Sequence, residues 1–69
     1  MSAFTDRLKE VRNSVGKTQS EVARDLKISS TGYAGYEQGY REPDFDMLIK
    51  ICKYFDVTAD YMIGLSDDM

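Results

Sequence analysis

The strongest constraint on the fold of this 69-residue chain is the stretch KTQSEVARDLKISSTGYAGYEQGYREP, residues 17–43. Thr18 stands three residues before Glu21, which is the spacing of a capping box. In that motif the hydroxyl and the carboxylate each accept a hydrogen bond from an otherwise unpaired amide at a helix start. Val22, Ala23 and Leu26 then recur at helical spacing. The pattern predicts a short helix over about residues 19–26.

A second short helix is predicted a few residues later, over about residues 30–38. Ser29 is a good N-cap for it, and Gly39 is a good C-terminal stop. The chain must turn sharply between the two helices, so Lys27 is predicted to take a left-handed conformation with a positive φ, at a cost of about 1 kcal/mol. Two short helices joined by such a turn form a helix-turn-helix, whose second helix enters the major groove in the DNA-binding versions. The spacing of these two helices alone is equally compatible with a small helical domain that does not bind DNA.

The residues before this stretch predict one more helix, over residues 2–15. Ser2 is a possible cap, and Gly16 is suited to a left-handed stop. One apolar stripe at helical spacing is predicted to face the core; it consists of Phe4, Leu8, Val11 and Val15.

Two further helices are predicted after Pro43. Asp44 is an N-cap candidate for the longer one, and Thr58 for a short one that ends at Gly64. The longer helix is predicted to bury a single face made of Phe45, Leu48, Ile51, Cys52 and Phe55. Val57 is predicted to plug the core, and the short helix carries Tyr61 and Met62. Residues 66–69 are expected to form a frayed acidic end. No segment predicts a strand, so the fold class is all-α.

Composition limits the chain to a single small globular domain, residues 1–69. The chain is 42% hydrophobic and 30% charged, with no His and one Cys, Cys52. A lone Cys with no His predicts no internal disulfide, no metal site and no cofactor, and the simplest role for Cys52 is a buried apolar residue. No catalytic constellation or phosphate-binding glycine loop appears, so an enzyme is not expected. There is no apolar run near the ~20 residues of a membrane span and no signal peptide, which favours a cytoplasmic protein without membrane contact.

The net charge of −3 argues against DNA binding, because phosphate contacts dominate affinity for DNA. Its distribution weakens that objection. Residues 1–16 carry +1, residues 17–43 carry 0 and residues 44–69 carry −4. The acidic residues therefore lie in the last third of the sequence, away from the predicted helix-turn-helix.

From about Phe4 to Gly64 the chain resembles the Cro/C1-type helix-turn-helix domain of phage repressors and xenobiotic-response-element-like bacterial regulators. The shared pattern is carried by Arg7-Leu8-Lys9, Arg12, Thr18-Gln19, Glu21, Ala23, Leu26, Ile28-Ser29, Tyr36-Glu37-x-Gly39-x-Arg41-x-Pro43, Leu48, Phe55, Val57, Asp60-Tyr61 and Gly64. The resemblance implies a compact five-helix phage-repressor-like domain, with its helix-turn-helix at about residues 18–38. It also implies a transcriptional regulator, most often a repressor, that binds a two-fold operator in double-stranded DNA as a homodimer.

The resemblance also implies roles for individual residues. Those expected at DNA are Lys17, Thr18, Gln19, Ser29, Ser30, Thr31, Gly32, Gly35, Gln38, Tyr40 and Arg41. Ser30, Thr31 and Gly35 match base-reading positions on the outward face, and Gln19 matches a backbone contact. Arg41 is expected to contact phosphate or to enter the minor groove. For Thr18 a plain helix cap, and for Lys17 a solvated side chain, are alternatives. Arg12 and Glu37 match a partly buried ion pair that ties the first helix to the third. Tyr33 and Tyr36 are expected to pack in the core.

The chain departs from the family in having no Lys, Arg, Gln or Asn between Ser29 and Glu37, and in having Lys27 where the turn usually has Gly. Hydroxyl groups discriminate bases poorly compared with Arg or Gln. An alternative is therefore a protein-interaction module with weak or no DNA binding, whose partner contacts the acidic last third. Candidate dimer contacts are Tyr54, Tyr61, Met62, Ile63 and Leu65.

Overall fold

A computed structural model describes residues 2–69, and five helices make up the regular structure of that range. They are α1 (Ala3–Ser14), α2 (Gln19–Leu26), α3 (Ser30–Gln38), α4 (Phe45–Phe55) and α5 (Ala59–Met62). The prediction of an all-α, five-helix fold is confirmed. None of these helices is long and apolar enough to cross a membrane.

A polar side chain caps the start of every helix. In each case its oxygen accepts a hydrogen bond from the backbone amide three residues later, which satisfies one unpaired donor of the first turn. The capping residues are Ser2, Thr18, Ser29, Asp44 and Thr58. The full capping box at Thr18 and Glu21 is present. Local sequence signals therefore set the helix starts.

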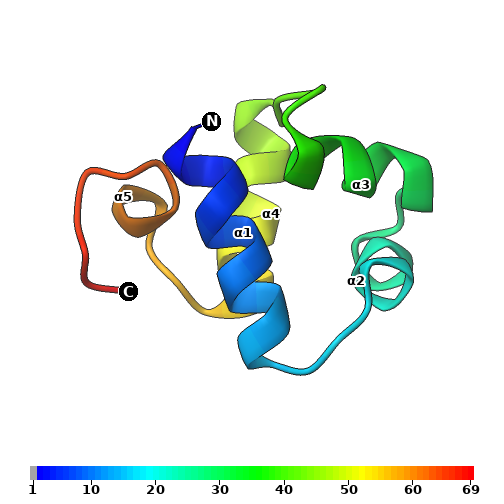
Figure 1. The fold of residues 1–69 in the computed structure, drawn as a ribbon, viewed down its shortest axis with the longest axis horizontal. Helices are drawn as coiled ribbons and strands as arrows, with labels where there is room; N and C mark the ends of the chain where they lie inside the picture. The colour runs from blue at the N-terminus through cyan, green and yellow to red at the C-terminus, as the bar shows by residue number, and fades with distance from the viewer. Residues whose placement is uncertain (1) are drawn as a thin grey trace.

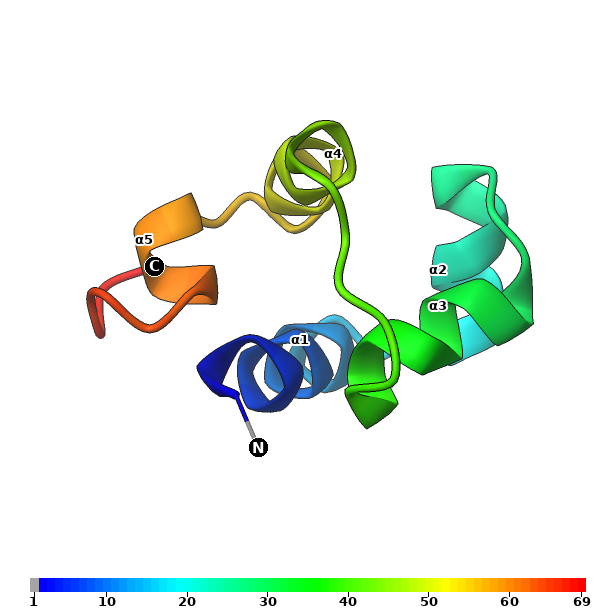
Figure 2. The same cartoon turned by 90° about the horizontal axis from the view of Figure 1, so that it is seen from above.

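Helix α1 runs through the middle of the molecule, with α5 on one side and the α2–α3 pair on the other (Figure 1). Helices α2 and α3 pack on each other, and α4 contacts both α2 and α5. Seen from above, a loop connects the end of α3 to the start of α4 (Figure 2). The C-terminal segment lies near α5, on the side away from α3 in both views (Figures 1 and 2).

The turn between α2 and α3 is as predicted. Lys27 is left-handed, with φ 63° and ψ 41°, and its amide donates to carbonyls in the last turn of α2. Gly16 after α1 and Gly39 after α3 are left-handed as well. These three stops keep α1, α2 and α3 short and separate.

One core joins all five helices. It consists of Leu8, Val11, Val22, Ala23, Leu26, Tyr33, Tyr36, Ile51, Cys52, Phe55, Tyr61 and Met62. Val57 is partly buried against this core, as are Phe4 and Leu48. Burial raises the pKa of the Cys52 thiol, which agrees with its role as a small apolar residue.

Two predicted core positions are wrong. Val15 is 49% exposed and Phe45 is 83% exposed. Val15 follows the last residue of α1, so it does not continue the helical stripe. Phe45 opens α4, one turn before the partly buried Leu48, and that first turn extends beyond the core. Periodicity gives the direction of a side chain but not the distance to which the core extends.

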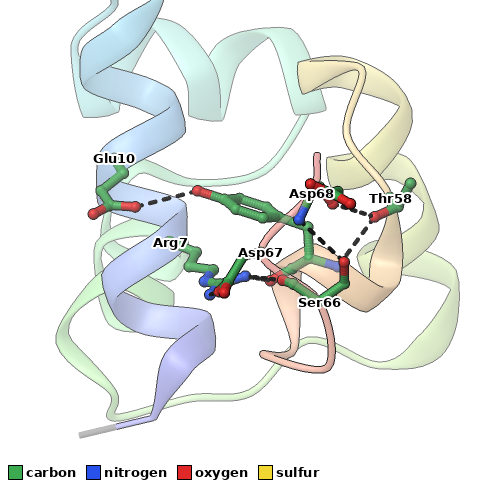
Figure 3. Close-up of polar contacts among 7 residues, drawn as sticks. Arg7, Glu10, Thr58, Ser66, Asp67 and Asp68 are labelled. Atoms are coloured by element: carbon green, nitrogen blue, oxygen red, sulfur yellow. Dashed lines mark hydrogen bonds and ion pairs between the residues drawn. The ribbon is translucent and has the colours of Figure 1, made fainter.

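The prediction of a frayed acidic end is also wrong. Arg7 on α1 donates to the carbonyl oxygens of Tyr61 (2.8 Å) and Ser66, and forms an ion pair with Asp67 (2.8 Å) (Figure 3). The amide of Thr58 donates to the carbonyl of Met69 at 2.9 Å. These bonds fold the last residues back against α1 and α5.

Candidate nucleic-acid interface

The first turn of α3 presents its hydroxyl groups to solvent. Ser30 and Thr31 are exposed. The hydroxyl of Ser29 is occupied, because it accepts from the Gly32 amide at 3.0 Å as the N-cap. Two hydroxyl side chains with free hydrogen-bonding capacity therefore stand where the helix-turn-helix places its groove-facing residues.

A buried carboxylate holds the opposite end of α3. Glu37 is 1% exposed, and Arg12 on α1 pairs with it through Nε to Oε2 at 2.6 Å and Nη2 to Oε1 at 3.1 Å. Gln19 on α2 adds a third bond, from Nε2 to Oε1 at 3.0 Å. The predicted Arg12–Glu37 pair is confirmed, and Gln19 braces α3 through the same carboxylate. One side chain thus connects α1, α2 and α3.

The electrostatics of this network favour the charged forms. Burial by itself would raise the pKa of Glu37, but the hydrogen bonds from Arg12 and Gln19 bring that pKa below its ordinary value. The hydrogen bond to Glu37 raises the pKa of Arg12. Both groups are therefore ionised near neutral pH, and the pair persists over the physiological range.

The two tyrosines of α3 pack in the core, as predicted. Tyr33 is 0% exposed and Tyr36 is 8% exposed. The hydroxyl of Tyr33 finds no hydrogen-bond partner among residues 2–69. Burial, together with the nearby negative charge of Glu37, raises the pKa of Tyr33. The inner face of α3 is therefore fixed by aromatic packing, and its outer face is left for contacts outside the domain.

Gly32 and Gly35 lie on the outer face of α3, beneath the side chain of Arg41, and so are not open to solvent. Both are buried. A Cβ built at Gly35 would lie 3.1 Å from Cδ and 3.2 Å from Cγ of Arg41. The side chain of Arg41 therefore covers this part of α3, whose surface it can approach because the two positions lack side chains.

At the start of α2 the side chains are already engaged within the domain. Thr18 acts as the N-cap of α2, which was the predicted alternative to a DNA contact. The ammonium of Lys17 lies 3.1 Å from Asp25 and 5.3 Å from the centre of the Tyr54 ring. The positive charge of Lys17 is thus partly neutralised within the domain, although its ammonium has further donors.

At the other end of α3, three of the predicted DNA residues are exposed together. Gln38 is the last residue of α3, and Tyr40 and Arg41 follow in the loop. Tyr40 is 82% exposed. The structure thus brings exposed polar groups to both ends of α3. The side chain of Arg41 covers the part of the helix between these ends.

Sequence reasoning missed Lys50 on α4. Its ammonium donates to the carbonyl oxygen of Leu26 at 3.1 Å, so α4 satisfies an unpaired acceptor at the C-terminus of α2. This bond steadies the turn into α3. The two residues are 24 positions apart, so no local pattern could have indicated it.

Among the proposed dimer contacts, Tyr61 and Met62 are buried in the core and cannot serve. Tyr54 is partly buried, and its hydroxyl donates to Asp25 at 2.6 Å. Ile63 and Leu65 are 46% and 75% exposed. The exposed Phe45 lines a shallow cleft together with Ile63 and Leu48.

Comparison with known proteins places this geometry in a family. The sequence matches the helix-turn-helix family over residues 8–62. The HTH-type transcriptional regulator ImmR of Bacillus subtilis (strain 168) is 43% identical over 58 residues, which cover 84% of this chain and 46% of ImmR. The cryptic phage CTXphi transcriptional repressor RstR of Vibrio cholerae is 34% identical over 59 residues, which cover 86% of this chain and 53% of RstR. The chain spans about half the length of these two relatives.

A solved structure agrees with the fold. The crystal structure of a transcriptional regulator from Listeria innocua aligns with a TM-score of 0.83 at 24% identity, over 96% of this chain and 62% of that one. The arrangement of the five helices is therefore one that is already known from a solved structure. The prediction of a non-enzymatic domain of this kind agrees with the family match and with the names of the relatives.

Proposed function

This chain belongs to the helix-turn-helix family, and from that premise we propose that it is a DNA-binding transcriptional regulator. Helix α3 enters the major groove of an operator, and the chain acts as a homodimer on two-fold-related half-sites. Regulation is by repression: the dimer covers promoter DNA and excludes the polymerase. The fold does not set the sign of regulation, so repression rests on the likeness to the repressor RstR.

The observation that carries the proposal is the contrast between the two faces of α3. The inner face is fixed by Tyr33, Tyr36 and the Glu37 network. The outer face presents Ser30 and Thr31 to solvent. A recognition helix needs this combination, because base contacts require side chains held in a fixed register.

The direct test is selection from a random duplex library with the purified chain at about 100 mM salt, followed by titration of the selected duplex against salt. An operator-reading dimer enriches a palindromic motif, with half-site centres about 34–36 Å apart or a multiple of that. The variant carrying Ser30→Ala and Thr31→Ala loses affinity for that motif. The variant Asn13→Ala, which changes an exposed residue in the last turn of α1, serves as the control. Weak binding that is uniform over all sequences would refute specific recognition.

The sign of regulation requires a second assay. Transcription from a promoter that contains the selected motif is measured in vitro with and without the chain. Repression predicts that transcript falls as the motif is occupied. An increase in transcript at the same occupancy would show that the chain is an activator.

A second candidate function is a protein-interaction module on the same fold. Exposed apolar side chains favour it, because Phe45, Ile49 and Leu65 are each at least half exposed in the acidic last third. The proposed homodimer would use the same exposed apolar side chains. The oligomeric state of the chain therefore distinguishes a DNA-binding dimer from a protein-interaction module. Analytical ultracentrifugation of the wild type and of Phe45→Ser should show a dimer that the substitution weakens. A monomer at all concentrations that also fails to select DNA would favour the interaction module.

A further inference from the structure

The side chain of Arg41 lies along the outer face of α3, although Arg41 itself belongs to the following loop. Its Cγ and Cδ lie over Gly35, at 3.2 and 3.1 Å from where a Cβ would stand. One guanidinium nitrogen, Nη1, lies 3.6 Å from the corresponding point at Gly32. The side chain therefore runs backwards along α3, from its last turns towards its first turn.

Backbone bonds fix the origin of this path. Gly39 is left-handed, with φ 83°, and reverses the chain at the end of α3. The amides of Tyr40 and Arg41 then donate to the carbonyl oxygen of Gly35, at 3.0 and 3.3 Å. The backbone of Arg41 is thereby held next to the helix turn that its side chain covers.

The guanidinium of Arg41 is not engaged by other side chains or carbonyl groups of the described domain. Within residues 2–69, Arg41 takes part in none of the ion pairs and its side chain makes no hydrogen bond, whereas Arg7 and Arg12 each use several donors inside the domain. Helix α3 has no Lys or Arg of its own. Arg41 therefore places a positive charge on the outer face of α3.

We propose that Arg41 is the principal base-reading residue of this domain. Its guanidinium, carried over Gly35 and Gly32, enters the major groove with α3 and donates two hydrogen bonds to N7 and O6 of one guanine in each half-site. This inference rests on the proposed function and replaces the expectation that Arg41 contacts phosphate or enters the minor groove. The planar fork of Arg matches the two guanine acceptors, whereas hydroxyl groups such as those of Ser30 and Thr31 accept several bases.

The test compares selected motifs for the wild type, Arg41→Lys and Arg41→Ala. Arg41→Lys keeps the positive charge, so a phosphate contact would survive in it, but it lacks the fork. The control is Lys53→Ala, which removes an exposed cation from the last turn of α4. Arg41 is exposed, and thermal melting confirms that each variant folds. The wild type and the control should select the same guanine, whereas both Arg41 variants should lose at least about tenfold in preference for it.

A second measurement identifies the atom that is read. Each guanine of the motif is replaced in turn by 7-deazaguanine, which removes the N7 acceptor and keeps base pairing. One replacement should weaken wild-type binding about tenfold and leave Arg41→Ala binding unchanged. An unchanged motif with uniformly weaker binding in Arg41→Ala would make Arg41 a phosphate contact and overturn the inference, while the proposed function stands. Failure of the wild type to select any motif would overturn both.

Discussion

Replacing Arg12 by Met isolates the energetic role of the Glu37 network. Met has a similar apolar stem and no charge, so the change leaves the carboxylate of Glu37, 1% exposed, with Gln19 as its remaining hydrogen-bond donor. Removing one partner of a buried ion pair typically costs about 3–5 kcal/mol. A domain of 69 residues has a free energy of unfolding of about 3–10 kcal/mol at the usual stability per residue. The variant should therefore lose about a third of its stability or more, and its melting temperature should fall by more than about 12 °C.

The pH dependence of this loss gives a second, independent signature. The pKa of Glu37 is lowered in the folded wild type, so its contribution to stability is present above the unfolded pKa of about 4.3 and is lost as pH falls through the lower folded pKa. In Arg12→Met, burial without the guanidinium should raise the pKa of Glu37 instead. Protonation then relieves the buried charge, so the difference in stability between wild type and variant should shrink as pH falls from neutral towards 4.

The assay is urea denaturation followed by far-UV circular dichroism, at neutral pH and at acid pH, for Arg12→Met, Glu37→Gln and the double variant. Glu37→Gln should cost less, about 1–2 kcal/mol, because Arg12 keeps its bond to the carbonyl of Lys17 and is partly exposed. The double variant should be more stable than Arg12→Met alone, since no unpaired charge remains. A loss under about 1 kcal/mol in Arg12→Met, or a loss that does not change with pH, would refute the reasoning.

Three further predictions test the local structure. Lys27→Gly should stabilise the domain by about 1 kcal/mol in thermal denaturation, because φ at this position is 63° and glycine takes that conformation without strain; a lower melting temperature would contradict this. Gly64→Ala should destabilise by about 1–3 kcal/mol and more than Gly16→Ala, because the new Cβ at residue 64 would lie 2.6 Å from that of Ala3, whereas Gly16 has equal left-handed strain and nothing within 4 Å; equal melting temperatures would count against the contact. Arg7→Ala should release the C-terminal residues, so the amides of Leu65 and Ser66 should exchange hydrogen faster than in Arg7→Lys; unchanged protection would mean that Arg7 does not hold them.

Most of the fold was accessible from sequence because its signals are local. Caps such as Ser29 and stops such as Gly39 act within one helical turn. They gave the starts of all five helices to within about a residue, and both bounds of α2 and α3. Lys27 could be predicted because two helices so close together leave the turn no other geometry. The Arg12–Glu37 pair came from the family pattern rather than from spacing, and the structure confirms it.

The site was less accessible because it depends on contacts between distant segments. Nothing in the order of residues indicates that Arg41 turns back over Gly35, or that Arg7 reaches Ser66 across 59 positions. The exposure of Val15 and Phe45 has the same origin. The apolar pattern of a helix shows which face is buried, but it does not show how far along that face the neighbouring helices extend.

The same geometry explains how a chain of net charge −3 can present a surface suited to DNA. Asp25, Glu37 and Asp67 are each paired with a cation from another segment. The C-terminal segment, which carries Asp67 and Asp68, lies on the side away from α3 (Figure 1). Arg41 is left without a carboxylate partner, so α3 presents a positive charge although the molecule as a whole is negative.

This arrangement implies that few phosphates are neutralised per protomer, because α3 has no Lys or Arg of its own and Lys17 is paired with Asp25. The salt dependence of specific binding should therefore be shallow, since each neutralised phosphate contributes about −0.9 to the slope of log K against log salt. A slope steeper than about −6 for the proposed dimer would mean that cations outside this surface, such as Lys17, reach the backbone. Titration of the selected operator measures the slope directly, and Lys17→Ala would make it shallower only in that second case.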